Sequence, residues 1–475
     1  MNPMPTTIDF RGNSQRVPPG MPGAVQKATA KFLGNRAALV EALGNDLWQL
    51  LRQAGHEIRL HALTHLDAYL ELAETAIVKA GGNVHWARDA AEAQQILLDI
   101  AGRHRARLVV KSKSMATEEI GLNHALEGAG IRVLETDLGE YIVQLAGVGP
   151  AHIVVPAFYM SKEEIAALFR EKLGVDAPAE AERLTQIARA KLREEFLAAD
   201  LGVSGGNFLV AETGTIVTVT NEGNGRMCTT VPPVHVAVVG IDKIVPDWES
   251  LTVLLKLLAR SATGQKLSCY TQFISGAPRT QEETGPKEMH VILLDNGRSR
   301  ILESEATRKT LLCIRCGACL NICPVYNTVG GYTYGYPISG PTGAIFASQI
   351  LGSKAAGALP FASTLCGACN DICPVKIPIT DILLHLRHRV VEGDETESAT
   401  APYTMRLAAQ AGSAALGATG LYTIGSRMLK IVQKPFVKDG WMANLPAPLH
   451  RWTSSRPFPA FAADFRQWWR GRRKA

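Results

Sequence analysis

Two short cysteine motifs in the second half of the chain constrain its structure more than any other feature. The first, CIRCGACLNICPVYN from Cys313, has the spacing C-x2-C-x2-C-x3-C followed by proline. The second, LCGACNDICPV from Leu365, has three cysteines before its proline. The first spacing is that of bacterial ferredoxins, in which three cysteines bind one iron–sulfur cluster and the fourth binds its neighbour. The motifs therefore predict a helical two-cluster domain in which backbone N–H groups bond the cluster sulfurs.

Alignment of the motifs on their closing Cys-Pro pairs predicts two unequal ligand sets. Ser363 occupies the position of the missing eighth cysteine. Three thiolates suit a [3Fe–4S] cluster, or a [4Fe–4S] cluster whose last ligand is water, Ser363 or another residue. Cys228 and Cys269 stand alone and we expect them to be packed small hydrophobes, although either would be able to supply that ligand. An open iron would also be able to bind a substrate. If the fourth ligands cross between the motifs, the first set comprises Cys313, Cys316, Cys319 and Cys373, and the second comprises Cys323, Cys366 and Cys369.

Structural zinc is the alternative for a cysteine pattern of this kind. Zinc sites are tetrahedral and are often built from two C-x2-C pairs. Seven cysteines with two Cys-Pro endings do not divide into such pairs, so the pattern favours iron–sulfur clusters.

From the rest of the chain we expect a large intracellular protein. Its 475 residues indicate two or three domains. The first residues, MNPMPTTIDFRGNSQRV, are polar and lack an apolar secretion signal, so we expect a cytoplasmic protein whose cysteines serve metal or redox chemistry. The net charge of +6 is uneven, because the residues from Arg427 onward carry eleven Lys and Arg against Asp439 and Asp464. This distribution predicts a basic tail and gives no indication of nucleic-acid binding.

Changes of pattern along the chain predict four regions, which together make a multidomain α/β plus α protein. Residues 1–75 have apolar residues at helical spacing. Residues 76–298 alternate apolar runs with helical stretches, which is typical of a parallel sheet covered by helices. Residues 300–392 form the ferredoxin-type domain, and residues 393–475 form a helical, basic end. The predicted strands are RLVVK (107–111), IRVLE (131–135), HIVVP (152–156), NFLVAETGTIVTVT (207–220), VHVAVVG (234–240) and MHVILLD (289–295).

An α/β region followed by CIRCGACLNICPVYN, GGYTYGYPISGPTGA and STLCGACNDICPVKIP resembles the lactate utilization protein B family over nearly the whole chain. The resemblance implies an electron carrier in a three-protein system that oxidises L-lactate to pyruvate. Its partners would be the A- and C-type lactate utilization proteins and an unidentified electron acceptor. The resemblance also implies two [4Fe–4S] clusters on the two cysteine sets. It implies an isomerase-like or CoA-transferase-like fold for the α/β region.

Several polar groups are further candidates for a site. Residues 111–114 (Lys111, Ser112, Lys113 and Ser114) follow a predicted strand, where they would bind a carboxylate or phosphate, or form a solvated loop with a serine cap. Residues 212–215, which include Glu212, would supply a pocket carboxylate or a turn between strands. Ser204 in GVSGG matches a hydrolase motif, but its flanking elements are in reversed order, so we expect a glycine-rich turn. An ordinary helix face explains His56, His61 and His65 better than a metal site does.

The C-terminal region raises the question of membrane contact. The stretch from Leu407 to Ser426 has no charged residue but is dominated by Ala, Gly, Ser and Thr, so we expect a buried or partner-facing helix instead of a transmembrane span. The tail FRQWWRGRRKA contains Trp468, Trp469 and five basic residues. It would contact an anionic membrane surface, dock a partner protein, or form a frayed end.

Two functions fit these features. An electron-transfer subunit is favoured, because two adjacent clusters form a short relay. The alternative is a catalytic subunit that binds a hydroxy acid at the three-cysteine cluster or in a pocket of the α/β region. We find no G-x-G-x-x-G after a strand and no G-x4-G-K-[ST], so nothing indicates nucleotide or flavin binding by those routes.

Overall fold

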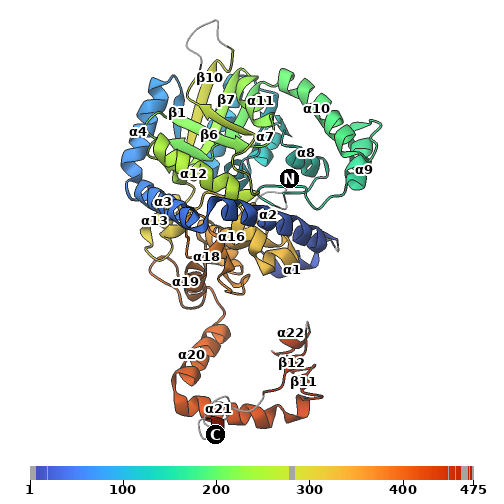
Figure 1. The fold of residues 1–475 in the computed structure, drawn as a ribbon, viewed down its shortest axis with the longest axis vertical. Coiled ribbons are helices and arrows are strands. Elements are labelled where there is room, and N and C mark those ends of the chain that lie inside the picture. The colour runs from blue at the N-terminus through green and yellow to red at the C-terminus, as the bar shows by residue number, and fades with distance from the viewer. Residues whose placement is uncertain are drawn as a thin grey trace. The chain divides into compact units, whose positions relative to one another are not determined.

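The computed structural model describes residues 7–461 except 19, 151, 278–283, 448 and 455, together with residues 469, 471 and 472. Contacts between residues divide the chain into two compact units, Met1–Thr400 and Ala401–Ala475. The first unit contains the predicted sheet and both cysteine motifs (Figure 1).

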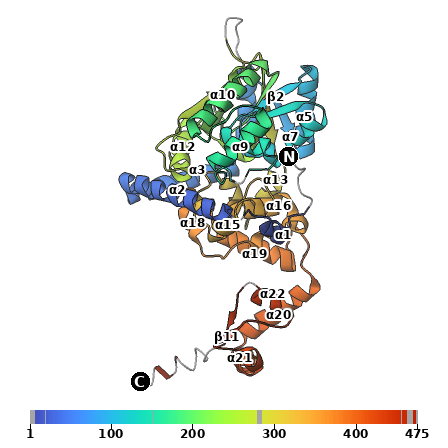
Figure 2. The same cartoon turned by 90° about the vertical axis from the view of Figure 1, so that its right-hand side faces the viewer.

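The first unit begins with the predicted helices. Gly44, with a φ of 88°, separates the two long ones, because this conformation ends a helix at little cost only for glycine. Two views show these long helices between the strands and the cysteine region (Figures 1 and 2). The helices are α1 (Phe10–Gln15), α2 (Met21–Leu43), α3 (Asn45–Thr64) and α4 (Leu66–Lys79).

A six-stranded sheet follows, in which every neighbouring pair is parallel. Its strand order is β1-β10-β7-β4-β2-β3. Because all strands run the same way, their carboxyl ends meet at one edge, where α/β proteins usually bind ligands. The strands are β1 (Asn83–Ala87), β2 (Leu108–Lys111), β3 (Arg132–Glu135), β4 (Leu201–Gly205), β7 (Val234–Gly240) and β10 (Glu288–Leu294).

Helices cover both faces of this sheet, as its continuous apolar strands require. One face packs on α5 and α7, and the other packs on α8 to α10 and on α4. A capping box formed by Ser161 and Glu164 starts α9. These helices are α5 (Ala90–Arg103), α6 (Met115–Glu119), α7 (Leu122–Gly128), α8 (Leu138–Leu145), α9 (Lys162–Leu173), α10 (Ala181–Ala198), α11 (Asn224–Thr230), α12 (Trp248–Ala262) and α13 (Arg298–Glu303).

Two predicted strands of this sheet are wrong. The HIVVP segment is irregular, because the His152 ring accepts hydrogen bonds from the backbone N–H groups of Val154 and Val155 and so turns the chain locally. The segment 207–220 belongs to a second sheet of order β8-β5-β6-β9. A short turn joins β5 to β6, and such a turn allows only antiparallel pairing. The strands of this sheet are β5 (Phe208–Val210), β6 (Thr215–Thr220), β8 (Ile244–Val245) and β9 (Tyr270–Ile274).

The GVSGG segment also differs from the prediction. It lies in β4, which pairs with β2 and β7, and is a strand and not a turn. The side chain of Ser204 is therefore buried inside the sheet, where its hydroxyl bonds His235 Nε2 at 2.8 Å. A nucleophile elbow needs an exposed serine, so no such role follows for Ser204.

The cysteine region is built from short helices, as predicted. The GGYTYGYPISGPTG insert leads into a buried helix, α16. The elements are η2 (Arg308–Leu312), α14 (Ala318–Ile322), α15 (Pro324–Val329), η3 (Tyr332–Tyr334), α16 (Gly340–Ile350), α17 (Gly352–Ala356), η4 (Leu359–Phe361), α18 (Ala368–Ile372) and α19 (Ile379–Glu392). The remaining short helix, η1 (Ile241–Lys243), belongs to the α/β region and follows β7.

The second unit consists of small elements with little core. The helices that cover the predicted stretch 407–426 have no buried residue. Among the residues that the structure describes, no helix is both long enough and apolar enough to cross a bilayer. The elements are α20 (Tyr403–Gly417), α21 (Thr419–Val432), η5 (Lys434–Phe436), β11 (Trp441–Met442), α22 (His450–Thr453) and β12 (Phe458–Pro459).

Candidate metal centre

The two cysteine motifs fold into matching loops. The residue before the shared Cys-Gly-Ala-Cys sequence, Arg315 in the first motif and Leu365 in the second, has a positive φ of 58° or 54°. Gly317 and Gly367 follow with φ values of 76° and 82°, and each precedes a short helix, α14 or α18. These two helices pack against each other, so the motifs lie side by side.

Four of the cysteine thiols act on one another. Burial raises the pKa of Cys316, and the thiols of Cys313 and Cys373 raise it further. Burial also raises the pKa of Cys319 well above its ordinary value, with contributions from Cys313, Cys316, Cys373 and Cys369. For Cys373, burial and then Cys313 raise the pKa to about 11. The structure thus brings together Cys313, Cys316, Cys319 and Cys373, the first predicted set.

The other three thiols form a second group. Burial, followed by Cys323 and Cys366, raises the pKa of Cys369 to about 12. Burial and Cys366 likewise raise the pKa of Cys323. Cys366 is exposed, and a hydrogen bond from the backbone of Ala368 lowers its pKa. These are the members of the second predicted set, which reaches the surface while the first is mostly buried.

The arrangement suits a multi-iron cluster better than a single metal ion. Among the described residues, which include all nine cysteines, no three cysteine sulfurs lie within 4.8 Å of one another, whereas thiolates on one zinc ion are closer than this. Ligands of a cluster bind different iron atoms and stand further apart. Backbone N–H groups also face the cysteine sulfurs: Arg315 to Cys313 at 3.4 Å, Tyr326 to Cys323 at 3.5 Å and Ile377 to Cys373 at 3.4 Å.

Basic side chains gather around the first set. Arg315 and Lys243 lower the pKa of Cys313, against the effect of its burial. The guanidinium groups of Arg36 and Arg52 interact electrostatically with Cys373, and that of Arg59 interacts with Cys313. These cations favour thiolates and the negative charge of a bound cluster.

Helix α3 presents three of its polar side chains to the cluster region. Arg52 donates to the carbonyl of Cys373 at 2.8 Å, and the His56 ring bonds the carbonyl of Val375 at 2.9 Å. Arg59 is fully buried and donates to the carbonyls of Leu311 and Ile244, at 2.9 and 2.7 Å, which joins the cluster region to the four-stranded sheet. The local sequence pattern could not single out these arginines, since the carbonyls of Ile244, Leu311 and Cys373 that they bond are 185 or more residues away.

The candidates for a fourth ligand of the second set are in different places. Ser363 precedes Cys366 and Cys369 of that set, and its hydroxyl accepts a hydrogen bond from the backbone of Leu365 at 3.1 Å. Cys228 is buried in the core between the sheet and α8 to α10, with its sulfur 3.2 Å from the Thr136 hydroxyl. Cys269 is exposed just before β9, so the expectation of a packed hydrophobe is confirmed for Cys228 and wrong for Cys269. Both free cysteines therefore belong to the α/β region, and Ser363 and water remain the nearer choices.

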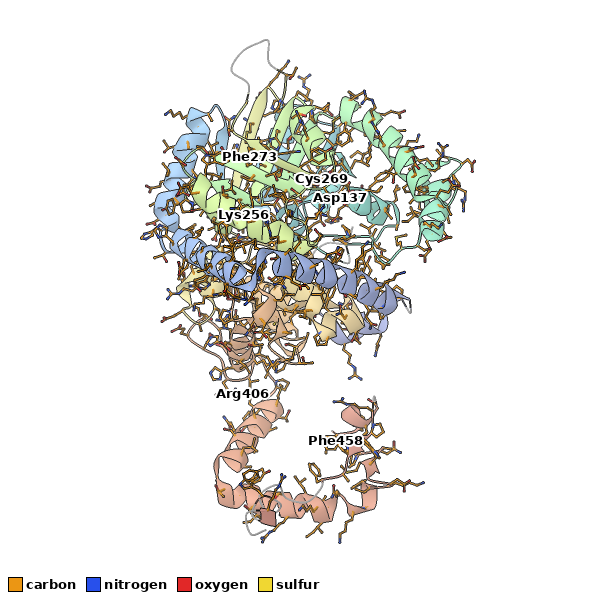
Figure 3. All side chains as sticks on the ribbon, in the orientation of Figure 1. Asp137, Lys256, Cys269, Phe273, Arg406 and Phe458 are labelled. Carbon is orange, nitrogen blue, oxygen red and sulfur yellow. The ribbon has the colours of Figure 1, made fainter. Side chains whose placement is uncertain are left out.

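A cavity of about 390 Å³ lies at the carboxyl ends of the parallel strands. The cavity is lined by the loops after β2, β3, β4, β7 and β10, together with β6 and α12. Figure 3 labels Asp137, which belongs to this lining, and Phe273, which belongs to the adjacent sheet. The segment Ile314–Cys316 of the first cysteine motif lines the cavity as well. A ligand-sized pocket therefore adjoins the first cysteine set.

The residues of the 111–114 segment have different roles, since Lys111 is part of the buried structure and the other three line the pocket. Lys111 is fully buried, where burial alone would lower its pKa, but pairing with Glu118 and Glu135, both at 2.7 Å, raises the pKa above its ordinary value. Ser114 caps α6. Ser112, Lys113 and Ser114 line the cavity, so the expectation of a solvated loop is wrong while the serine cap is confirmed.

The remaining candidates have structural explanations. Residues 212–214 belong to the turn between β5 and β6, and Thr215 begins β6; Glu212 is exposed and outside the cavity lining. His61 bonds the Tyr69 hydroxyl at 2.9 Å and stacks on His65. Of the tail, Trp469 and Arg472 are within the described residues, whereas Trp468, Arg466, Arg470, Arg473 and Lys474 lie outside them.

Two family models define the class of protein to which this architecture belongs. The LUD domain model matches residues 70–294, the region of the parallel sheet, and the 4Fe-4S dicluster domain model matches residues 309–377, the region of the cysteine motifs. The chain is therefore an iron–sulfur protein with a parallel-sheet α/β domain followed by a ferredoxin-type domain.

Full-length relatives give the particular family. Lactate utilization protein B of Bacillus licheniformis is 43% identical over 456 residues, covering 96% of this chain and 94% of the relative. The proteins of the same name from Bacillus cereus (strain AH820) and Bacillus anthracis (strain A0248) are also 43% identical, over 455 residues, with the same coverage. The chain belongs to the lactate utilization protein B family.

A solved structure, the crystal structure of a DUF162 family protein from Deinococcus radiodurans, also matches. The identity is 18%, the match covers 48% of this chain and 98% of that chain, and the TM-score is 0.28. A TM-score this low does not define the fold.

Proposed function

We propose that the protein is the electron-transfer component of a system that oxidises L-lactate to pyruvate, and that its two cysteine sets hold two [4Fe–4S] clusters. Membership of the lactate utilization protein B family supports the metabolic role. Bound clusters of this kind supply one-electron transfer. The A- and C-type lactate utilization proteins and a separate electron acceptor would be its partners.

The observation that carries this proposal is the unequal environment of the two sets. The first set is surrounded by basic side chains and adjoins the pocket. The second set has an exposed member, Cys366, and three thiols in place of four. Charge, hydrogen bonding and exposure tune cluster potentials, so the two sites would differ in potential, as sites of a relay do. The exposed second set would exchange electrons with a partner.

Anaerobic purification followed by iron and sulfide analysis and a redox titration monitored by EPR tests the proposal. We expect about eight iron atoms per chain and two reducible signals. Both signals should appear when lactate and the partner proteins are added. A preparation that binds zinc in place of iron, or clusters that lactate and the partners cannot reduce, would contradict it.

Substitution of single cysteines tests the crossed sets. Cys373→Ser should remove the same EPR signal as Cys316→Ser, although Cys373 belongs to the other motif. Cys369→Ser should remove the other signal. Cys269→Ser is the matched control, because this exposed cysteine belongs to neither set, and it should keep both signals. If Cys373→Ser and Cys369→Ser removed the same EPR signal, and Cys316→Ser removed only the other signal, Cys373 would bind the cluster of its own motif. This result would exclude the exchange of fourth ligands between the motifs.

A further inference from the structure

The pocket beside the first cysteine set contains polar groups that suggest a ligand. Its volume of about 390 Å³ falls within the range of small-molecule sites. It lies at the carboxyl ends of the parallel strands, the usual position for ligands in such sheets. The end of β4 contributes a glycine here, Gly205, because a side chain at this position would collide with the Ser114 hydroxyl.

Four basic side chains line the pocket, but three of them are paired with acidic groups. Arg298 binds Glu119 at 2.8 Å and Asp242 at 2.5 Å, and Lys243 shares Asp242. Lys113 lies 3.2 Å from Asp137 and donates to the carbonyl of Val154 at 2.7 Å.

Arg315 is the exception. No carboxylate of the described residues forms an ion pair with it, and its Nη1 nitrogen is buried without a hydrogen-bond partner among them. Its guanidinium carbon stands 4.0 Å from the centre of the Phe346 ring, which holds the plane of the group in place. A buried donor without a partner costs free energy, and a planar guanidinium matches a carboxylate well.

The cluster loop itself does not require this arginine. The second motif has the same loop, with the same backbone conformation, and carries Leu365 at the equivalent position. The difference between the motifs is that the first lines the pocket. Arg315 is thus explained by its surroundings, the pocket and the first cysteine set, and not by the fold of the cysteine motif.

The acidic groups of the pocket leave room for an anion. Asp137 accepts hydrogen bonds from the start of α8, and Glu119 is held by Arg298. Burial, followed by Asp137, raises the pKa of Glu222, which reduces its negative charge. The Asn224 amide oxygen is buried and lacks a hydrogen-bond partner among the described residues, so it offers an acceptor to a hydroxyl group.

We propose that this pocket binds a small organic acid, with its carboxylate on Arg315 and Lys113, directly beside the first cysteine set. The proposal deepens the electron-transfer function and rests on it only for the identity of the cluster. Cys316 lines the same pocket, so the bound acid and a cluster on that set would share one electrostatic environment.

This proximity predicts reciprocal coupling between acid binding and reduction. A reduced cluster carries more negative charge, so the acid should bind the oxidised protein more tightly and lower the potential of that cluster. A tenfold difference in affinity corresponds to a shift of about 59 mV for one electron.

Calorimetric titration of the anaerobically purified full chain tests the proposal, with L-lactate, pyruvate and the uncharged analogue lactamide as probes. We expect saturable binding of at least one acid to a single site, and at least tenfold weaker binding of lactamide. Arg315→Leu, which copies the second motif, should weaken acid binding at least tenfold. Arg183→Leu, at an exposed arginine of α10, is the matched control and should bind as the wild type does.

Iron and sulfide content measured on the same samples separates this proposal from the function. Wild-type protein without iron would overturn the electron-transfer function. Wild-type protein with full iron content but no saturable binding of either acid would overturn the pocket alone. So would lactamide binding as tightly as the acids, or an unchanged affinity in Arg315→Leu. If Arg315→Leu loses iron, the test uses Lys113→Gln, because Lys113 lies outside the cysteine motifs. This variant should also weaken acid binding at least tenfold, and an unchanged affinity would overturn the proposal.

Discussion

Glu140, in α8, is a buried carboxyl group whose two oxygens have no hydrogen-bond partner among the described residues. Burial, followed by the neighbouring Glu135 and Glu118, raises the pKa of this carboxyl well above its ordinary value. The folded protein therefore keeps the proton at pH values where the unfolded chain has released it. Each further rise in pH favours the unfolded state until the folded pKa is reached.

We predict that Glu140→Gln makes stability less dependent on pH. The amide cannot ionise, so the stability that the wild type loses above a pH of about 4 to 5 should be retained. The effect should be about 1–3 kcal/mol, the usual scale for a buried polar group without a partner. Thermal unfolding midpoints between pH 5 and pH 8 measure it. Glu163→Gln, at an exposed position of α9, should keep the wild-type slope, and an unchanged slope in Glu140→Gln would contradict the prediction.

Single residues also show how far the sequence could predict the site. The cysteine spacing predicted that the thiols of the two motifs lie together, because the motif determines local geometry, and their division into two ligand sets stays a prediction. Lys111 and Lys113 are alike in sequence, but one is buried between two glutamates and the other lines the pocket. Their difference depends on Glu135, a residue of the next strand, and so could not be inferred from the local pattern. Arg315 stood inside the motif and differed from Leu365, which was an available signal.

At the scale of elements, α2 and α3 connect the cluster region to the rest of the first unit. Arg36 of α2 donates to the carbonyl of Ile372 at 3.3 Å, lies over the Trp48 ring, and interacts electrostatically with Cys316 and Cys373. A helix far from the motifs in sequence thus supplies positive charge to the first cysteine set. Helical periodicity predicted the helices, but it could not predict these contacts.

We predict that Arg36→Gln lowers the reduction potential of the cluster on the first set only. Removal of a nearby positive charge disfavours the reduced, more negative state, and a partly screened charge should shift the potential by tens of millivolts, on the order of 1 kcal/mol. Arg36→Lys keeps the charge and should shift it less. EPR-monitored redox titration measures both variants. Equal shifts in the two variants, or a shift of the other signal, would show that charge at this position does not set the potential.

For the molecule as a whole, the sequence pattern predicted the architecture well, but it predicted less well which strands pair with one another. The continuous apolar runs of β7 and β10 and the helices between strands identified a parallel sheet. The assignment of 207–220 failed because apolar strands of both sheets look alike in sequence. Which sheet a strand joins depends on the length of its connection, and the turn before Thr215 is too short for a parallel crossover.

Many large apolar side chains in the described part of the second unit, Ala401–Ala475, are exposed. Leu421, Ile424, Met428 and Ile431 of α21 are each more than half exposed and recur at helical spacing. Arg427 and Lys430 lie on the same helix, and the residues from Arg427 onward carry a net charge of +9. An apolar stripe beside basic side chains is typical of helices that lie in the surface of an anionic membrane.

We therefore predict that the full chain binds anionic lipid vesicles through α21. It should sediment with vesicles that contain phosphatidylserine, less so at high salt, and weakly with vesicles of phosphatidylcholine alone, because both apolar burial and charge contribute. Ile424→Asp places a charge in the apolar stripe and should reduce binding several-fold. Ser413→Asp adds the same charge at an exposed position of α20 and should reduce it much less. Both variants should retain wild-type iron, since the cysteine sets lie in the first unit. If the two substitutions reduce binding equally, the net charge governs binding and the apolar stripe does not. If the wild type does not sediment with either kind of vesicle, the prediction is wrong, and the exposed helices of this unit serve contact with another protein.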